Sequence, residues 1–112
     1  MVRPSKFEIT QTAAGDGVTL SIEGELDMRT TGQLSERVAE QLDHGATDLT
    51  LDLRELAFMD STGLRLLIDF HDRSREEGWR LKLISPRHEP AALVLRATGA
   101  DKALPFVDGS EP

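Results

Sequence analysis

The sequence predicts a single α/β domain, with three or four helices packed on a mixed sheet of four or five strands. Two kinds of segment alternate along the chain. In one, every second residue is apolar, which is typical of half-buried strands; in the other, apolar residues recur every three or four positions, which is typical of amphipathic helices. Strands that alternate with helices imply right-handed parallel crossovers and a central sheet. A length of 112 residues also suits one small domain. We place its core at about residues 7–106 of a single 1–112 domain and expect residues 107–112 to be a flexible tail.

Composition and charge exclude several classes of protein. The chain has 20 acidic residues against 13 Lys and Arg, a formal net charge of −7, and no cysteine. Binding of nucleic acid needs clustered cations, and disulfides, thiolate catalysis and cysteine zinc sites need cysteine. No apolar run approaches the ~18 residues of a membrane span, and the first residues lack the apolar region of a signal peptide. We expect a cytoplasmic protein, monomeric when free, that binds neither nucleic acid nor membranes.

The N-terminal segment predicts a β-hairpin. Apolar residues alternate with polar ones over residues 7–10 and again over 18–22, and Ala14-Gly15-Asp16-Gly17 between them has the composition of a turn. The segment Gly24-Glu25-Leu26-Asp27 is expected to be the loop that leaves the second strand.

A first helix is predicted over residues 30–44, where apolar residues recur every four positions. Thr30 and Gln33 fit a capping box, in which each side chain satisfies a backbone N–H group at the start of the helix. The clean alternation of leucine over residues 48–53 then predicts a strand.

A second, longer helix is predicted over residues 61–77. Its exposed side carries Arg65, Asp69 and Arg73 at i,i+4 spacing, which is expected to produce two ion pairs. Its apolar stripe toward the core comprises Leu64, Leu67, Ile68 and His71, widened by Leu66 and Phe70. The remaining elements are a strand over residues 80–84, a helix over 89–98 and a last strand near 104–106.

The most informative segment is Asp60-Ser61-Thr62-Gly63, where a strand is expected to end and the long helix to begin. A hydroxyl here lies among backbone N–H groups that have no partner within the helix, at the positive end of the helix dipole. The same groups favour a phosphate, and Gly63 would let the backbone of another protein approach closely. The alternative is an ordinary helix cap, in which Ser61 stabilises the first turn by ~0.5–2 kcal/mol. The local pattern does not decide between them.

Two segments resemble the markers of a known family. The run from Phe58 to Leu64 is similar to the phosphorylation-site signature of STAS-domain anti-anti-sigma factors (anti-sigma factor antagonists), an Asp-Ser-(Ser/Thr)-Gly-Leu sequence that follows a β-strand. The segment Gly24-Glu25-Leu26-Asp27, followed three residues later by Thr30, is similar to the family's second marker, between the hairpin and the first helix. The expected order of elements also matches the STAS fold over about residues 7–106.

The resemblance implies a non-enzymatic switch in transcription regulation, for example in a stress response. An unphosphorylated member of the family binds an anti-sigma factor, a GHKL-type serine kinase, and the sigma factor is released. The kinase then phosphorylates the serine that corresponds to Ser61, and a PP2C-type phosphatase restores the hydroxyl. Asp27 and Asp60 correspond to two aspartates of the family near that serine. The implied partner-binding surface comprises Asp27, Met59, Asp60, Ser61, Thr62, Gly63 and Leu64.

Phosphorylation of Ser61 would act through charge. A phosphate adds about −1.5 to −2 charges at neutral pH, and Asp60 and Asp27 would place further negative charge beside it. An unpaired charge buried at an interface is costly. We therefore expect the modification to end the complex without a change of fold.

Two other functions remain open. A STAS adaptor that is never phosphorylated, such as the accessory subunit of a transport ATPase, would use the same surface for permanent docking. A nucleotide-responsive STAS module would need a phosphate loop, and Gly15 and Gly17 form only a hairpin turn. No cofactor or metal is expected, because His44, His71 and His88 lack the spacing of a metal site. The nucleophile motif of the α/β-hydrolases is also absent, so the sequence does not indicate an enzyme.

Overall fold

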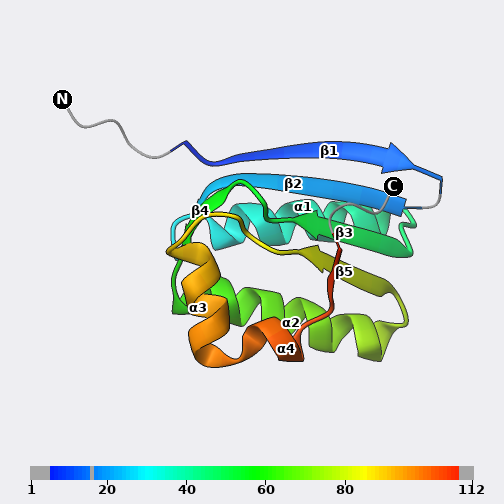
Figure 1. Cartoon of the computed structure of the whole chain (residues 1–112). Coiled ribbons are helices and arrows are strands. Elements are labelled where there is room, and N and C mark those ends of the chain that lie inside the picture. The colour runs from blue at the N-terminus through cyan, green and yellow to red at the C-terminus, as the bar shows by residue number, and fades with distance from the viewer. Residues whose placement is uncertain (1–5, 16, 109–112) are drawn as a thin grey trace.

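The structure, a computed structural model, describes residues 6–15 and 17–108 and shows an α/β arrangement over them (Figure 1). The elements are β1 (Glu8–Ala14), β2 (Gly17–Leu26), α1 (Thr31–Asp43), β3 (Asp48–Asp52), β4 (Leu56–Met59), α2 (Ser61–Glu77), β5 (Arg80–Ile84), α3 (Ala91–Thr98), α4 (Ala100–Ala103) and β6 (Phe106–Val107).

Six strands of the described chain form one mixed sheet. Their order is β1-β2-β3-β5-β6, and β4 pairs with the C-terminal end of β2 off this path. β1 is antiparallel to β2, as a hairpin requires, and the other described pairings are parallel. The predicted α/β fold is confirmed, with one strand more than the four or five expected.

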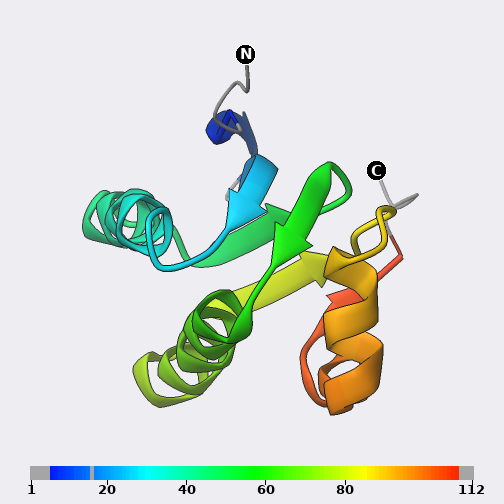
Figure 2. The same ribbon diagram turned by 90° about the vertical axis from the view of Figure 1, so that its left-hand side faces the viewer.

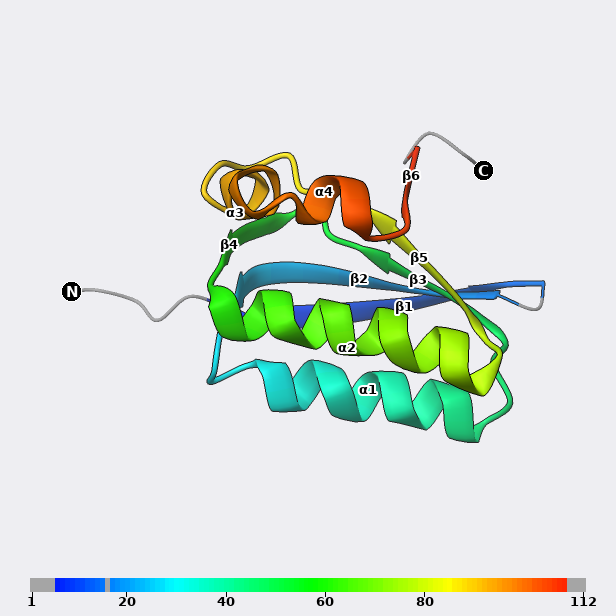
Figure 3. The same cartoon turned by 90° about the horizontal axis from the view of Figure 1, so that it is seen from below.

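The helices lie beside one another against the sheet. Figures 2 and 3 show α1 and α2 running side by side along one face, with α3 and α4 on the far side of α2 from α1. This arrangement places the N-terminal ends of α1 and α2 next to each other, at the edge of the sheet where β2 and β4 end.

The core fills the space between sheet and helices. Alternate residues of β2, β3 and β5 are buried against the buried sides of α1 and α2, as the period of two in their sequences predicts. Each fully buried leucine contributes about 1.5–3 kcal/mol relative to an exposed one. The strands contribute Leu20, Ile22, Leu49, Leu51, Leu81 and Leu83 to this core, and the two helices contribute Leu34, Val38, Leu67 and Phe70.

The prediction that residues 24–27 form a loop is wrong for residues 24–26, because β2 continues to Leu26. The register between β2 and β4 shifts between Gly24 and Glu25, which marks a bulge. Gly24 has a φ of 110°, and a Cβ atom there would collide with the backbone carbonyl of Lys6. Glycine is therefore required at this bend.

The strand β4 was not predicted as a separate element, although the motif was expected to follow a strand. Its four residues show no alternation, since Leu56 and Met59 are buried while Ala57 and Phe58 are exposed. The strand forms because the bulged end of β2 offers a parallel partner, which no local pattern can indicate.

The predicted core-facing stripe of α2 is rotated in the structure. The residues buried on this helix are Gly63, Leu67, Phe70 and Ser74, whereas Ile68 is 40% exposed and Leu64 and His71 are only half-buried. The rotation follows from Gly63, because the absence of a side chain lets that side of α2 approach the sheet most closely.

Several smaller expectations are also corrected. The pairs of Asp69 with Arg65 and Arg73 do not form among the described residues, and Arg73 instead bonds to Glu77 at 3.4 Å. Val107, expected in the tail, belongs to β6, while residues 109–112 of that tail and Asp16 of the hairpin turn lie outside the described residues. In the described part of the chain, no helix is long and apolar enough to cross a membrane.

Candidate functional site

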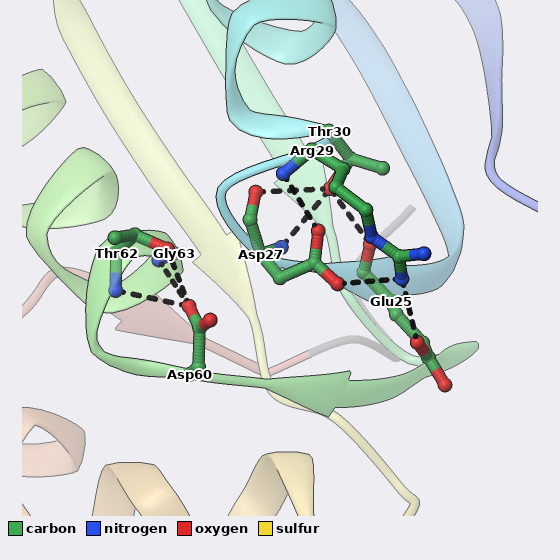
Figure 4. Close-up of polar contacts among 7 residues, drawn as sticks. All are labelled: Glu25, Asp27, Arg29, Thr30, Asp60, Thr62 and Gly63. Carbon is green, nitrogen blue, oxygen red and sulfur yellow. Dashed lines mark hydrogen bonds and ion pairs between the residues drawn. The ribbon is translucent and has the colours of Figure 1, made fainter.

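The candidate site lies where β2 and β4 end side by side (Figure 4). Leu26 of β2 pairs in parallel register with Met59 of β4, and the N–H group of Asp60 donates to the Leu26 carbonyl oxygen at 3.3 Å. Since both strands point the same way, the residues that follow them, Asp27 and Asp60, emerge at the same edge of the sheet. The two family-like segments therefore lie together, as expected.

Asp60 caps α2. It has extended backbone angles (φ −106°, ψ −170°), and its Oδ1 atom accepts hydrogen bonds from the N–H groups of Thr62 at 2.9 Å and Gly63 at 3.1 Å. The Thr62 hydroxyl donates to the same oxygen at 2.5 Å. This hydroxyl, with the two N–H groups, holds the pKa of the Asp60 carboxyl below its usual value, against the effects of burial and of nearby Asp27. The cap is thus a carboxylate at neutral pH.

Ser61 is not the cap that the alternative interpretation requires. It is the first residue of α2, and its side chain is exposed. Within the described part of the chain, no group bonds to its hydroxyl, while the neighbouring Thr62 hydroxyl is bound to Asp60. Ser61 therefore presents the free hydroxyl of this helix start.

The start of α2 is also not the phosphate cradle that its sequence suggested. Two N–H groups of the first turn, those of Thr62 and Gly63, already bond to the Asp60 carboxylate. A phosphate on Ser61 would meet a carboxylate in the place where the helix dipole would otherwise favour it. The Asp60 carboxylate would therefore repel a phosphate on Ser61.

Gly63 and Met59 have internal roles and do not form the exposed surface expected of them. Both are buried, Met59 completely. A Cβ atom on Gly63 would lie 2.6 Å from the Leu26 carbonyl oxygen and 2.9 Å from the Met59 Cγ atom. Gly63 thus allows a close approach between α2 and the ends of β2 and β4, not the approach of a partner. Leu64, half-buried, is shared between core and surface.

Asp27 is held by its neighbour Arg29. The Asp27 side chain accepts from the Arg29 backbone N–H at Oδ1 and from the Arg29 guanidinium at Oδ2, both at 2.9 Å. Hydrogen bonding to this guanidinium lowers the pKa of the Asp27 carboxyl, although burial of the residue, which is only 7% exposed, opposes the shift. The guanidinium also reaches Glu25 at 3.4 Å. Two ionised aspartates, Asp27 and Asp60, therefore lie near each other at this edge of the sheet, and Asp27 has its own cation.

The capping box predicted at Thr30 is wrong. The Thr30 hydroxyl accepts from the Asp27 N–H at 3.0 Å and donates to the Glu25 carbonyl at 2.8 Å, so it points back toward β2 and makes no cap bond. The Asp27 carbonyl instead accepts the N–H groups of Thr30 and Thr31 at the start of α1. Thr30 and Arg29 together brace the segment that positions Asp27.

Sequence reasoning missed two residues of this segment. Met28 is 76% exposed, more than any other large apolar side chain of the described residues, and it follows Asp27 directly at the edge that holds Ser61. Arg29 is the cation that binds Asp27 and Glu25. The signal was present in the sequence, because an apolar and a basic residue follow the family-like acidic segment, but neither belongs to the marker.

A second polar hollow, of about 210 Å³, lies away from Ser61 and involves β1, β2 and the segments after β3 and β5. Two ion pairs line it: Arg54 binds the Asp52 carboxylate through two nitrogen atoms at 3.0 and 2.8 Å, and Arg87 lies 3.4 Å from Glu55. Among the described residues, no group of three or more His, Asp or Glu side chains is placed to hold a metal ion.

The chain belongs to the STAS domain family. The family model described as "Mlab, STAS domain" matches residues 9–107, almost the whole of the described chain. The match covers both segments that carry the resemblance, the end of β2 and the start of α2.

Two curated relatives match the chain over part of its length. The anti-sigma-F factor antagonist RsfB of Mycobacterium tuberculosis is 33% identical over 67 residues, which are 60% of this chain and 55% of that protein. The anti-sigma-B factor antagonist of Bacillus subtilis is 32% identical over 66 residues, 59% of this chain and 60% of the relative. The matched region thus spans a little more than half the length of each relative.

Solved structures with similar folds include proteins of the same kind. An anti-sigma factor antagonist from Mycobacterium paratuberculosis superimposes with a TM-score of 0.79 at 22% identity, over 95% of this chain and 89% of that one. The antagonist SpoIIAA in its unphosphorylated form gives a TM-score of 0.71 at 23% identity, over 95% and 90% of the two chains. These likenesses confirm the STAS fold predicted from the sequence.

Proposed function

We propose that this STAS domain is an anti-sigma factor antagonist that is switched off by phosphorylation of Ser61. In its unmodified form it binds an anti-sigma factor that is a GHKL-type serine kinase, and the sigma factor is released. The kinase transfers a phosphoryl group from ATP to the Ser61 hydroxyl, and a PP2C-type phosphatase removes it. The domain itself is a cytoplasmic binding protein and not an enzyme.

One observation supports this proposal above the others. Ser61 offers an exposed hydroxyl without a partner among the described residues, at the point where two family-like aspartates converge. A serine that only stabilised the helix would bond to it, and here Asp60 does that instead. The names of the two curated relatives agree with the proposal.

The geometry also explains how a phosphate would end the complex. Asp60 and Asp27 are both held in the ionised form, and a phosphate would add about −1.5 to −2 charges beside them. A partner surface that accommodates the neutral hydroxyl would then face a cluster of like charge, which costs several kcal/mol when water is excluded.

Met28 supplies the apolar part of the same surface. Methionine is enriched at protein interfaces relative to the rest of the surface, and the centre of an interface is depleted of charged residues while its rim is polar. Here Glu25 and Arg29 form such a rim next to Met28. We infer that Met28 inserts into the partner while Ser61 lies at the contact.

The proposal is tested by displacement. The unmodified protein is added to a purified complex of the cognate sigma factor with its anti-sigma factor, and free sigma factor is measured by size-exclusion chromatography. We expect the sigma factor to be released in proportion to the protein added, and no release by protein phosphorylated at Ser61. Failure of a molar excess of unmodified protein to release the sigma factor would contradict the proposal.

A second candidate is a STAS adaptor that is never phosphorylated, such as the accessory subunit of a transport ATPase. It is favoured by the matching family model, whose description names Mlab and a STAS domain but no sigma-factor regulation. In that case Ser61 would be part of a permanent docking surface. Stable co-purification with a transport ATPase, combined with displacement of no sigma factor, would support it over the first proposal.

A further inference from the structure

Arg65 lies on α2 four residues after Ser61, and both side chains are exposed. The pair with Asp69 that its spacing predicts does not form, and Arg65 makes no hydrogen bond or ion pair with any described residue. The other arginine at this edge, Arg29, already bonds to Asp27 and Glu25. Arg65 is therefore an uncommitted cation one helical turn from the free hydroxyl.

The spacing places the two residues on one face of the helix. Side chains four residues apart in an α-helix are neighbours, with Cβ atoms roughly 5–6 Å apart. A guanidinium group offers N–H donors in a planar fork that matches two oxygen atoms of a phosphate. The long arginine side chain can therefore reach a phosphate on residue 61 without any movement of the backbone.

The rest of the surroundings leaves the phosphate few other partners. Asp60 occupies the N–H groups of Thr62 and Gly63, and Asp27 and Asp60 repel negative charge from the side of β2. Of the charged side chains named here, the two aspartates repel a phosphate and Arg29 is held by Asp27, whereas Arg65 on α2 has no partner among the described residues.

We propose that Arg65 binds the phosphate of phosphorylated Ser61 and acts as its counter-ion within the same helix. This inference rests on the proposed function and names a residue that regulates the modified state. The ion pair draws the phosphate along α2, away from Asp27, and neutralises part of the added charge. Arg65 is a positioning residue for the phosphorylated form and takes no part in the unmodified one.

The test measures the phosphate itself and needs no kinase. Phosphoserine is incorporated at position 61 during synthesis of the full chain, and its second ionisation is followed by 31P NMR across pH 4–9. A nearby cation stabilises the dianion, so Arg65→Gln should raise the pKa of the phosphate by about 0.2–0.4 pH units. Arg65→Lys, which keeps the charge, should retain a substantial part of the effect.

Arg75→Gln is the matched control, because it removes the same charge from an exposed position on α2 about 15 Å farther along the helix. It should leave the pKa of the phosphate unchanged. Equal pKa values in the parent protein and the Arg65→Gln variant, or an equal shift in Arg75→Gln, would overturn the role of Arg65. Because the phosphate is introduced synthetically, this outcome is independent of whether a kinase modifies Ser61, which the displacement experiment tests separately.

Discussion

The chain enters α1 and α2 at neighbouring points of one sheet edge, and in each case an aspartate follows the strand. At α2, Asp60 caps the helix and leaves the next residue, Ser61, free. At α1, Asp27 turns its carboxylate to Arg29, and the nearby hydroxyl of Thr30 bonds back to the strand. The start of α1 is braced by its own side chains, whereas the start of α2 keeps a hydroxyl available.

This difference separates two roles, capping of the helix and the presentation of a hydroxyl group without a partner. Capping needs an oxygen atom that accepts backbone N–H groups, and modification needs an oxygen atom that nothing else uses. Asp60 performs the first role, and Ser61 offers the oxygen atom that the proposed modification would need. The braced start of α1 fixes Asp27, and the exposed Met28 follows it in the chain.

The largest expected effect concerns charge at Ser61. Ser61→Asp should weaken binding to the cognate anti-sigma factor by roughly tenfold or more, because it adds negative charge beside Asp60 and Asp27 at the interface. Ser61→Asn introduces a side chain of nearly the same size as aspartate but without its charge. This variant should bind almost as well as the parent protein. Isothermal titration calorimetry on both variants checks this, and equal weakening by Asn and Asp would indicate a steric effect in place of an electrostatic one.

A large effect on folding is expected at Gly63. Gly63→Ala forces a Cβ atom against the Leu26 carbonyl, which is backbone and cannot rotate away, so the free energy of unfolding should fall by about 1–3 kcal/mol. Gly32→Ala in α1 is the matched control, because no heavy atom lies within 4 Å of the added Cβ atom. It should instead stabilise the protein by up to about 1 kcal/mol. Urea denaturation of both variants measures the contrast.

A smaller effect separates Asp60 from Ser61. Asp60→Ala should lower the free energy of unfolding by about 0.5–2 kcal/mol because it removes the cap, whereas Ser61→Ala should change it by less than about 0.5 kcal/mol. The contribution of Asp60 is present above the unfolded-state pKa of an aspartate and is lost as the pH falls through its lowered folded-state pKa. Equal losses from the two alanine variants would restore Ser61 as a cap.

The smallest expected effect concerns Arg29. Its guanidinium lowers the pKa of Asp27, so Arg29→Gln should raise that pKa toward the ordinary value. The stabilisation from ionised Asp27 exists above its unfolded-state pKa and disappears as the pH falls through the folded-state value. In the variant it should therefore disappear at a higher pH. NMR titration of the Asp27 carboxyl carbon checks this, and an unchanged pKa would mean that Arg29 does not hold Asp27 in solution.

The fold was predictable because its main elements carry strong periodic patterns. The alternation of leucine through β3 and the long apolar repeat of α2 define a strand and a helix before any tertiary contact is known. The strand β4 was missed because it depends on a bulge at Gly24 that brings the end of β2 beside it. The rotation of α2 was missed because the sequence indicates Gly63 as a point of approach for a partner protein, whereas it is the closest contact of the helix with the end of β2.

The location of the site was predictable from its two motifs, but the role of each residue within them was not. Nothing in Asp60-Ser61-Thr62 states which of the three oxygen-bearing side chains caps the helix, since all three residue types are good caps. Met59 and Gly63 belong to the motif by sequence and to the core by packing. The sequence could not indicate a role for Arg65, because its spacing predicts an ion pair with Asp69. Only the structure shows that this pair does not form.

The central claim is that Ser61 is the modified residue, while Asp60 caps α2 and binds the Thr62 hydroxyl. Phosphate uptake tests this claim most directly. The protein is incubated with its cognate anti-sigma kinase and ATP, and the site of any phosphate is located by fragmentation mass spectrometry, with Ser61→Ala and Thr62→Val in parallel. We expect one phosphate on Ser61 in the parent protein and in Thr62→Val, and none in Ser61→Ala. Phosphate on Thr62, or an unmodified parent protein in the presence of an active kinase that binds it, would contradict this account.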